Sequence, residues 1–206
     1  MDNAPKRIFV AVGTAPELQE AVAAWAAAHG ALPVRWLSGP VRNGVSNGAG
    51  KNLHVTLVPP WYERDTDAVA RKLAPLRGFA PFAVRFDRIV YGPSPREPRL
   101  IWAEGTAPQE LIELKQKIEL LLGVHPEARP FRLHLTLARL RTPKRSDGGQ
   151  ARFRPEQFAS FPMKRLDERV SWTEEIRSVL LMESHLSPAG ADYEVLADIP
   201  LRGSAD

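Results

Sequence analysis

Two nearly identical pentapeptides contain the residues of this sequence that are best suited to chemistry. Residues 53–57 (LHVTL) and 133–137 (LHLTL) each place a histidine and a threonine two positions apart. With five His and seven Thr in the chain, chance alone predicts about 0.2 His-x-Thr pairs. Two copies flanked by matching leucines therefore indicate an internal repeat with a shared role.

The spacing of two fits a β-strand, in which successive side chains point to opposite faces of the sheet. In each copy the three apolar residues then share one face, and the histidine and threonine share the other. We expect the apolar faces to pack under helices. His54 with Thr56 and His134 with Thr136 should face a shared cleft between two sheet-bearing lobes.

Two imidazoles across one cleft suit the cleavage of a phosphodiester near neutral pH. The pKa of a free imidazole lies near 6.5, so one ring can act as base while the other acts as acid. Threonine hydroxyls would hydrogen-bond the phosphate oxygens as charge builds up on them. This scheme needs no metal, and a zinc site at the motifs would lack a third ligand, because His29, His125 and His185 have no motif spacing and are predicted to be structural or surface residues.

The segments around the motifs predict an alternation of strands and helices, and hence a mostly antiparallel α+β fold. Pro59 and Pro60 are expected to end the strand that carries the first motif, since proline lacks a backbone donor. The composition of residues 38–50 is typical of a loop, and that of residues 142–150 resembles a linker. Predicted strands span 7–12, 34–37, 53–58, 82–90, 100–104, 131–138, 178–183 and 193–199, and predicted helices begin at Pro16 and span 66–76 and 108–122.

The repeat predicts a single domain over residues 1–206 made of two pseudo-symmetric antiparallel-sheet lobes. Outer helices would cover both lobes, and the cleft would lie between them. The lobes would comprise about residues 1–90 and 91–206, with exchange of strands between them allowed.

Composition places the chain among ordinary soluble globular proteins and excludes several classes of site. It has 206 residues, 44% of them hydrophobic, and a formal net charge of +4, which is too small an excess to prove nucleic-acid binding. The absence of cysteine excludes disulfides, iron–sulfur clusters and thiolate zinc sites. Apolar runs are too short to span a bilayer, so a cytoplasmic protein without membrane association is expected.

Four segments resemble a known family. Arg7–Val12 resembles its opening strand, Asn52–Leu57 its first motif, Phe131–Arg139 its second, and Glu183–Leu186 followed by Tyr193 its last hairpin. The family is the 2H phosphoesterases, and within it the RNA 2′,3′-cyclic phosphodiesterase group, also called LigT-like or 2′-5′ RNA ligase. The resemblance covers nearly the whole chain and implies the same bilobal α+β fold.

This resemblance implies an RNA-processing hydrolase that converts 2′,3′-cyclic phosphate ends to 2′-phosphates, with a reversible 2′-5′ ligase activity associated with the group. It implies RNA ends, such as those of tRNA fragments, as substrate. No metal and no cofactor are expected, and no feature of the sequence indicates an obligate protein partner. By the same resemblance, His54 is the proton donor, His134 the proton acceptor, and Thr56 and Thr136 hold the phosphate. Arg139 matches a substrate-binding arginine, although strict alternation puts it on the wrong face unless a bulge intervenes.

Two departures from the family pattern leave the substrate open. Residues 58–62 (VPPWY) replace the usual Phe-Leu-Gly, and the loop over 38–51 is longer than usual. A small cyclic nucleotide or ADP-ribose cyclic phosphate remains an alternative substrate, and a non-catalytic module that binds RNA ends remains an alternative function. Candidates for base stacking are Phe9, Trp36, Trp61 and Tyr62, and candidates for phosphate steering are Arg42, Lys51, Arg132 and Arg141.

Overall fold

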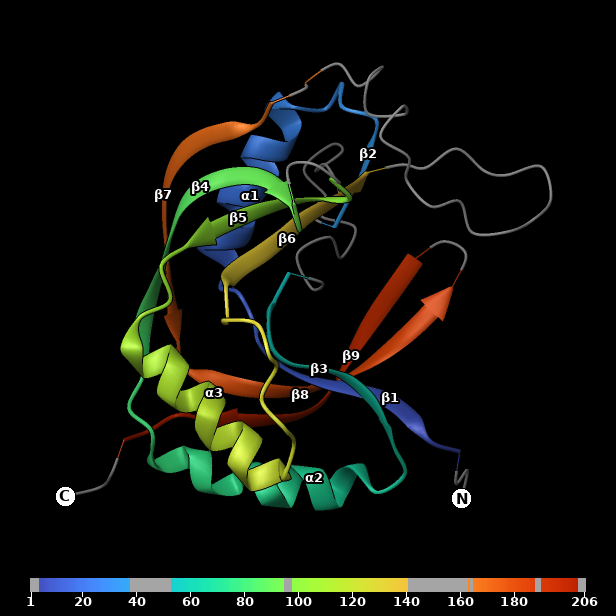
Figure 1. Cartoon of the computed structure of the whole chain (residues 1–206), viewed down its shortest axis with the longest axis vertical. Helices are drawn as coiled ribbons and strands as arrows, with labels where there is room; N and C mark the ends of the chain where they lie inside the picture. The colour runs from blue at the N-terminus through green and yellow to red at the C-terminus, as the bar shows by residue number, and fades with distance from the viewer. Residues whose placement is uncertain are drawn as a thin grey trace.

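The computed structural model confirms the predicted α+β fold with two antiparallel sheets, one above the other in Figure 1. It describes residues 4–37, 53–94, 98–140, 163, 165–187 and 190–203, so both expected loop segments, 38–50 and 142–150, lie outside the described residues. None of the helices in the described ranges is long and apolar enough to cross a membrane.

The first sheet has four strands and buries one face under two helices (Figure 1). Along β1, Ile8, Val10 and Val12 belong to the main hydrophobic core, whereas Phe9 and Ala11 point to the opposite face. This alternation separates the packing face from a second face that remains available for chemistry. The strand order is β3 (Val55–Glu63), β1 (Lys6–Val12), β8 (Ser178–Ser187) and β9 (Gly190–Pro200).

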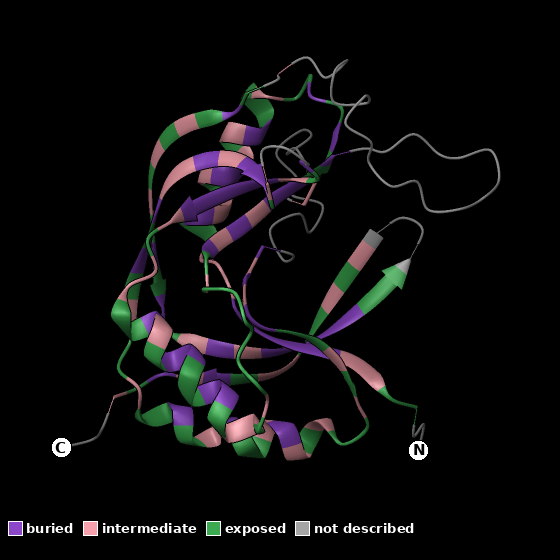
Figure 2. Ribbon diagram, in the orientation of Figure 1, coloured by how far each residue is buried: buried purple, intermediate pink, exposed green. Residues whose placement is uncertain are grey.

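The two helices below this sheet show buried stripes and exposed outer surfaces (Figure 2). Helix α2 (Thr66–Leu73) begins where the Asp65 carboxylate accepts a hydrogen bond from the Ala68 amide. It ends earlier than predicted and continues as a 3-10 helix (Ala74–Gly78), because Pro75 has no amide hydrogen for the α-helical ladder. Helix α3 (Gln109–Leu122) ends at Gly123, whose φ of 69° is left-handed.

The second sheet has five strands, and helix α1 (Pro16–Ala28) covers its outer face. Glu168 joins the two, since its carboxylate accepts a hydrogen bond from Trp25 Nε1 at 2.8 Å and contacts His29 Nε2 at 2.9 Å. His29 therefore has a structural role. The strand order is β2 (Val34–Trp36), β6 (Leu133–Leu140), β5 (Leu100–Gly105), β4 (Phe82–Gly92) and β7 (Asp167–Ile176).

Two sequence predictions about strands were wrong. Strand β7 was not predicted, because acidic residues such as Glu168 and Glu174 occupy its helix-facing positions, where they bond to α1 instead of packing. Strand β3 does not end at Pro59 but continues through both prolines to Glu63. It is an edge strand, and its register shifts so that the two prolines lie opposite the single residue Phe9. At such a bulge on an edge strand the ladder does not need the backbone N–H groups that prolines lack.

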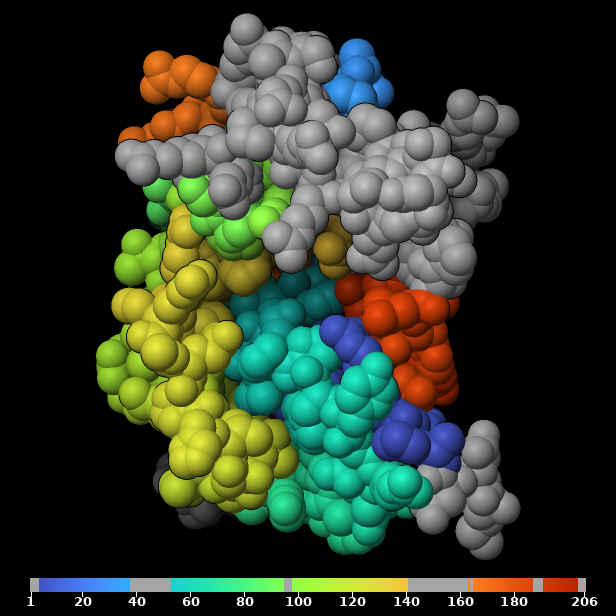
Figure 3. Space-filling view, turned by 45° about the vertical axis from the view of Figure 1, so that its right-hand side comes forward, coloured from blue at the N-terminus to red at the C-terminus, as the bar shows by residue number. Residues whose placement is uncertain are grey.

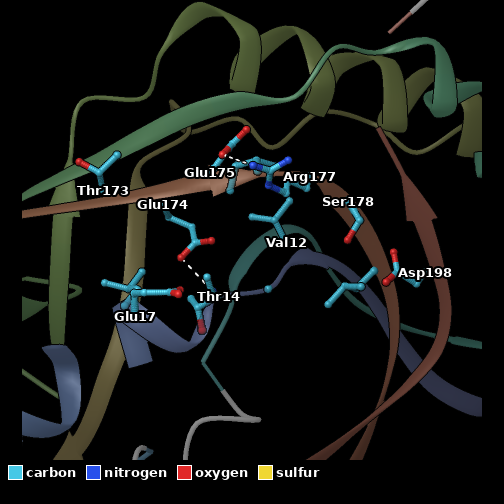
Figure 4. Close-up of a pocket in the computed structure, with 14 residues that line it drawn as sticks. Val12, Thr14, Glu17, Thr173, Glu174, Glu175, Arg177, Ser178 and Asp198 are labelled. Atoms are coloured by element: carbon cyan, nitrogen blue, oxygen red, sulfur yellow. Dashed lines mark hydrogen bonds and ion pairs between the residues drawn. The ribbon is translucent and has the colours of Figure 1, made fainter. Parts of the chain in front are cut away.

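A cavity of about 590 Å³ lies where the beginning of α1 meets the end of β7 (Figure 4). Glu174, which is 5% exposed, points into this region and accepts a hydrogen bond from the Ala15 amide at 3.0 Å. Ala15 is the N-cap of α1, so this carboxylate ties the helix to the second sheet. Burial, as the largest cause, raises the pKa of Glu174 above its ordinary value of 4.5.

We expect Glu174→Gln to gain stability relative to the wild type as pH rises. Ionising Glu174 costs more in the folded than in the unfolded protein, so the wild type loses stability as pH rises above 4.5 through the raised pKa. Glutamine keeps an acceptor for Ala15 but does not ionise. Urea unfolding of both proteins at about pH 4 and about pH 8 measures the difference. If the free energies of unfolding of the two proteins differ by the same amount at both pH values, the result would contradict this assignment.

Candidate active site between the two sheets

Residues from both His-x-Thr motifs line one pocket between the sheets. Its volume is about 550 Å³, and it contains His54 and Thr56 from the first sheet with Thr136 and Arg139 from the second. The space-filling view shows a recess between the surfaces of β3 and β6 (Figure 3). The other lining residues are Arg7, Phe9, Leu37, Pro60, Leu186, Ala191 and Tyr193.

On the first sheet, two aromatic rings hold the His54 imidazole. The Phe9 ring lies 5.0 Å from it between centroids, and the Tyr193 ring meets it edge to face at 4.9 Å. Phe9 and Tyr193 also contact each other at 5.2 Å. Thr56 follows on the same face, opposite Ala11 of β1. The sheet thus presents an imidazole and a hydroxyl to the pocket with the ring plane fixed by packing.

On the second sheet, His134 stacks on Trp102 with ring centroids 4.1 Å apart. Its Nδ1 lies 3.0 Å from the carbonyl oxygen of Arg132. Since a carbonyl only accepts, Nδ1 carries the hydrogen and Nε2 of the neutral ring keeps its lone pair. Burial lowers the pKa of His134 below 6.5, with the Arg132 charge as a smaller contribution in the same direction. The structure therefore favours a neutral imidazole here at neutral pH.

His134 is not among the residues that line the 550 Å³ pocket. It lies two residues before Thr136 on the same face of β6, where both side chains are half-buried. The structure thus brings His54, Thr56 and Thr136 into one pocket and places His134 beside it.

A buried carboxylate organises the surroundings of His134. Glu104 of β5, 9% exposed, lies directly across from His134. One of its oxygens accepts from Arg88 at 2.7 Å and the other from Arg132 at 2.6 Å. The Arg132 guanidinium lies 5.4 Å from the centroid of the Trp102 ring. Arg132 therefore bonds His134 through its main chain and covers the supporting tryptophan with its side chain.

Trp102 and Glu104 were not predicted as site residues. The available signal was the alternation within residues 100–104, which puts a tryptophan and a carboxylate on one face of an otherwise apolar strand. A further requirement comes from Gly92, where an added Cβ would overlap the ring of Trp102. Only glycine leaves room there for the indole that supports His134.

A β-bulge brings Arg139 to the face that strict alternation denies it. Ile101 pairs with Ala138 but Trp102 pairs with Thr136, so Leu137 is an extra residue in β6. After this residue the parity of the strand is reversed, and Arg139 joins Thr136 on the pocket side.

The other candidate residues lie in different surroundings, and most of them are outside the pocket. Of the four aromatic candidates for base stacking, only Phe9 lines the pocket. The ring centroids of Trp36 and of Trp25 on α1 lie 5.8 Å apart. Trp61 packs against the core, and Tyr62 is 69% exposed. Among the cationic candidates Arg132 is described above, and Arg42, Lys51 and Arg141 lie outside the described residues.

Within the described ranges, one group of side chains has the spacing of metal ligands. Ligand atoms of Glu183, His185 and Glu194 lie within 4.8 Å of one another. Glu183 pairs across the sheet with Ile8, so this group is on the face opposite to Phe9 and the pocket. The Lys6 ammonium already contacts Glu183 at 2.8 Å and opposes a cation there.

Comparison with known proteins adds family and fold. A family model described as the 2′-5′ RNA ligase superfamily matches residues 14–169. The protein TT0787 of Thermus thermophilus is 23% identical, with a TM-score of 0.66 over 97% of this chain and 100% of that one. Apo LigT of E. coli is 21% identical, with a TM-score of 0.64 over 96% and 98%. LigT in complex with 3′-AMP is 22% identical, with a TM-score of 0.62 over 96% and 98%. A search of curated proteins gives no match.

We expect His134 to titrate below 6.5 and the substitution Trp102→Leu to move its pKa upward. Burial against the indole disfavours the charged ring, so a smaller neighbour that admits water relieves part of that cost. NMR titration of the ring protons, assigned with a His134→Gln variant, measures both values. A titration above 6.5 in the wild type, or no change in a folded Trp102→Leu protein, would argue against this environment.

Proposed function

This chain belongs to the 2′-5′ RNA ligase superfamily, and we propose that it hydrolyses RNA 2′,3′-cyclic phosphate ends to 2′-phosphates with two histidines and no metal. The observation that carries the proposal is the geometry of the cleft. Two imidazole–hydroxyl pairs lie on sheets that face each other, and the residues around the two rings differ.

In the proposed reaction, His134 is the base. Its Nε2 lone pair takes a proton from water as the water oxygen attacks phosphorus. The P–O bond to the ribose 3′ oxygen breaks, and His54 donates a proton to that oxygen, which leaves a 2′-phosphate. The Nδ1 contact to the Arg132 carbonyl and the lowered pKa of His134 support this division of roles.

Three further residues would stabilise the transition state. Thr56 and Thr136 would donate hydroxyl hydrogen bonds to the non-bridging oxygens, and the Arg139 guanidinium would balance their charge. A 5′-hydroxyl in place of water would form a 2′-5′ linkage through the same attack, which is the ligase direction. The E. coli LigT structure with 3′-AMP supports a nucleotide 3′ end as the ligand.

A small cyclic phosphate is the second candidate substrate. The pocket of about 550 Å³ is in the size range of small-molecule sites, so a cyclic mononucleotide or an ADP-ribose cyclic phosphate would satisfy the same chemistry. The choice between this class and RNA depends on contacts beyond the pocket.

The direct test is incubation of the protein with a short RNA that ends in a 2′,3′-cyclic phosphate, with EDTA present. We expect a 2′-phosphate product, and a loss of about 10² to 10⁴ in turnover for His54→Ala and for His134→Ala. His125→Ala, an exposed histidine after α3, is the matched control and should retain activity. Absence of conversion by folded protein that still binds the oligonucleotide would leave a binding module. Conversion of small cyclic phosphates alone would favour the second candidate.

Replacement of Arg139 by alanine should reduce kcat/KM by about 10- to 100-fold, as expected for a hydrogen bond to a charged group. The control is Arg77→Ala in the 3-10 helix, which removes the same charge from an exposed position under the other sheet. Equal kinetics for the two variants would mean that the bulge presents Arg139 to the pocket without a role in the reaction.

A further inference from the structure

The pocket-facing side of the second sheet carries a row of charged side chains that begins at His134. The strand register places Glu104 opposite His134, Arg88 opposite Glu104, and Arg169 opposite Arg88. Residues that pair across neighbouring strands point to the same side of a sheet. The row therefore crosses β6, β5, β4 and β7 in one line on the face that carries the second motif.

Two adjacent cavities lie along this row. One has a volume of about 620 Å³ and the other about 330 Å³, and they share the lining residues Arg88, Glu104 and Arg132. The larger cavity also contains Arg169, and the smaller also contains Arg165. The shared residues make the two cavities parts of one hollow surface beside His134.

The arginines of this surface have donors left for a ligand. Glu104 is buried, and Arg88 and Arg132 occupy one oxygen each, so it presents little free negative charge. Arg165 and Arg169 are exposed, and neither has an ion-pair partner in the part of the chain that the structure describes. Among the described residues that line the two cavities, the other acids are Asp87 and Asp167, and Asp167 lies 4.0 Å from Arg88.

The row extends beyond the reach of one nucleotide bound in the pocket. Three steps between neighbouring strands separate His134 from Arg169, which is about 14 Å at about 4.8 Å per step. On the first sheet the pocket wall is apolar or aromatic at its hairpin, with Leu186 at 66% exposure, Ala191 and Tyr193. The one arginine that this sheet adds to the described pocket lining is Arg7, whose guanidinium donates a hydrogen bond to Ser184. A polyanion leaving the pocket along the second sheet thus meets the exposed guanidinium groups of Arg165 and Arg169, beside those of Arg88 and Arg132 that pair with Glu104.

We propose that Arg88, Arg132, Arg165 and Arg169 form an arginine track that binds the phosphodiester backbone on the 5′ side of the cyclic phosphate. This inference rests on the proposed function and deepens it, because it selects polynucleotides over small cyclic phosphates as the preferred substrate. Guanidinium forks suit phosphate oxygens, and such contacts act on the backbone without reading the base sequence.

The test compares a 2′,3′-cyclic mononucleotide with a ten-nucleotide RNA that carries the same cyclic end. The double variant Arg165→Ala/Arg169→Ala removes two track residues that contact no reacting atom, and Arg71→Ala/Arg77→Ala is the charge-matched control under the other sheet. We expect the track variant to raise KM for the RNA by about tenfold, and to lower the salt slope of binding by about 1.4, at about 0.7 per phosphate contact. Mononucleotide kinetics should stay unchanged, which also shows that the variant is folded.

Fluorescence anisotropy with a non-cyclic RNA of the same length tests the track without turnover. If the track variant binds this RNA more weakly than the control variant does, the result supports the arginine track. This holds even if no hydrolysis is found, a result that would contradict the proposed function alone. Equal RNA binding and equal KM in the track and control variants would overturn the track while leaving hydrolysis intact. A wild type that prefers the mononucleotide would overturn it as well.

Discussion

In the described part of the chain, helices cover one face of each sheet, and this constraint decides where every functional side chain can lie. Along each strand every second residue packs against helices, and the residues between them face the space between the sheets. In β6 the leucines at 133, 135 and 137 are buried in the core, so His134 and Thr136 must face outward. A slip of one residue would bury the polar pair and expose the leucines. The apolar residues of each motif therefore hold its chemistry in register.

Bulges then adjust this alternation in both strands that carry the motifs. In β6 the extra residue Leu137 reverses the alternation, so that Arg139 joins the pocket face. In β3 the prolines at 59 and 60 occupy a bulge on an edge strand, and Pro60 becomes part of the pocket wall. Both irregularities lie in the strands that carry the motifs, where a strictly regular ladder would place fewer groups around the pocket.

The two motifs, their faces and most elements were predictable because they depend on local periodicity. Leu111, Leu114 and Ile118 show helical spacing, and the structure buries all three in α3. Strand β7 was missed because its buried positions include acids whose partners come from α1, more than a hundred residues away. The roles of Trp102 and Glu104 depend on cross-strand register with β6, which no local pattern contains. The sequence thus predicts which residues share a face, and tertiary pairing decides which of them meet.

The two motifs are nearly identical, but the different surroundings of their histidines suit one ring to act as acid and the other as base. Acid–base catalysis requires one group that holds a proton and one that lacks it, and identical residues reach that state only when their environments differ. His54 lies between the rings of Phe9 and Tyr193, whereas His134 lies against Trp102 with its Nδ1 hydrogen directed at a carbonyl. The lone pair of His134 is thereby left on Nε2, and burial keeps the ring neutral. In the proposed reaction the duplicated strand supplies the two imidazoles, and the side chains that are not duplicated make one of them the base.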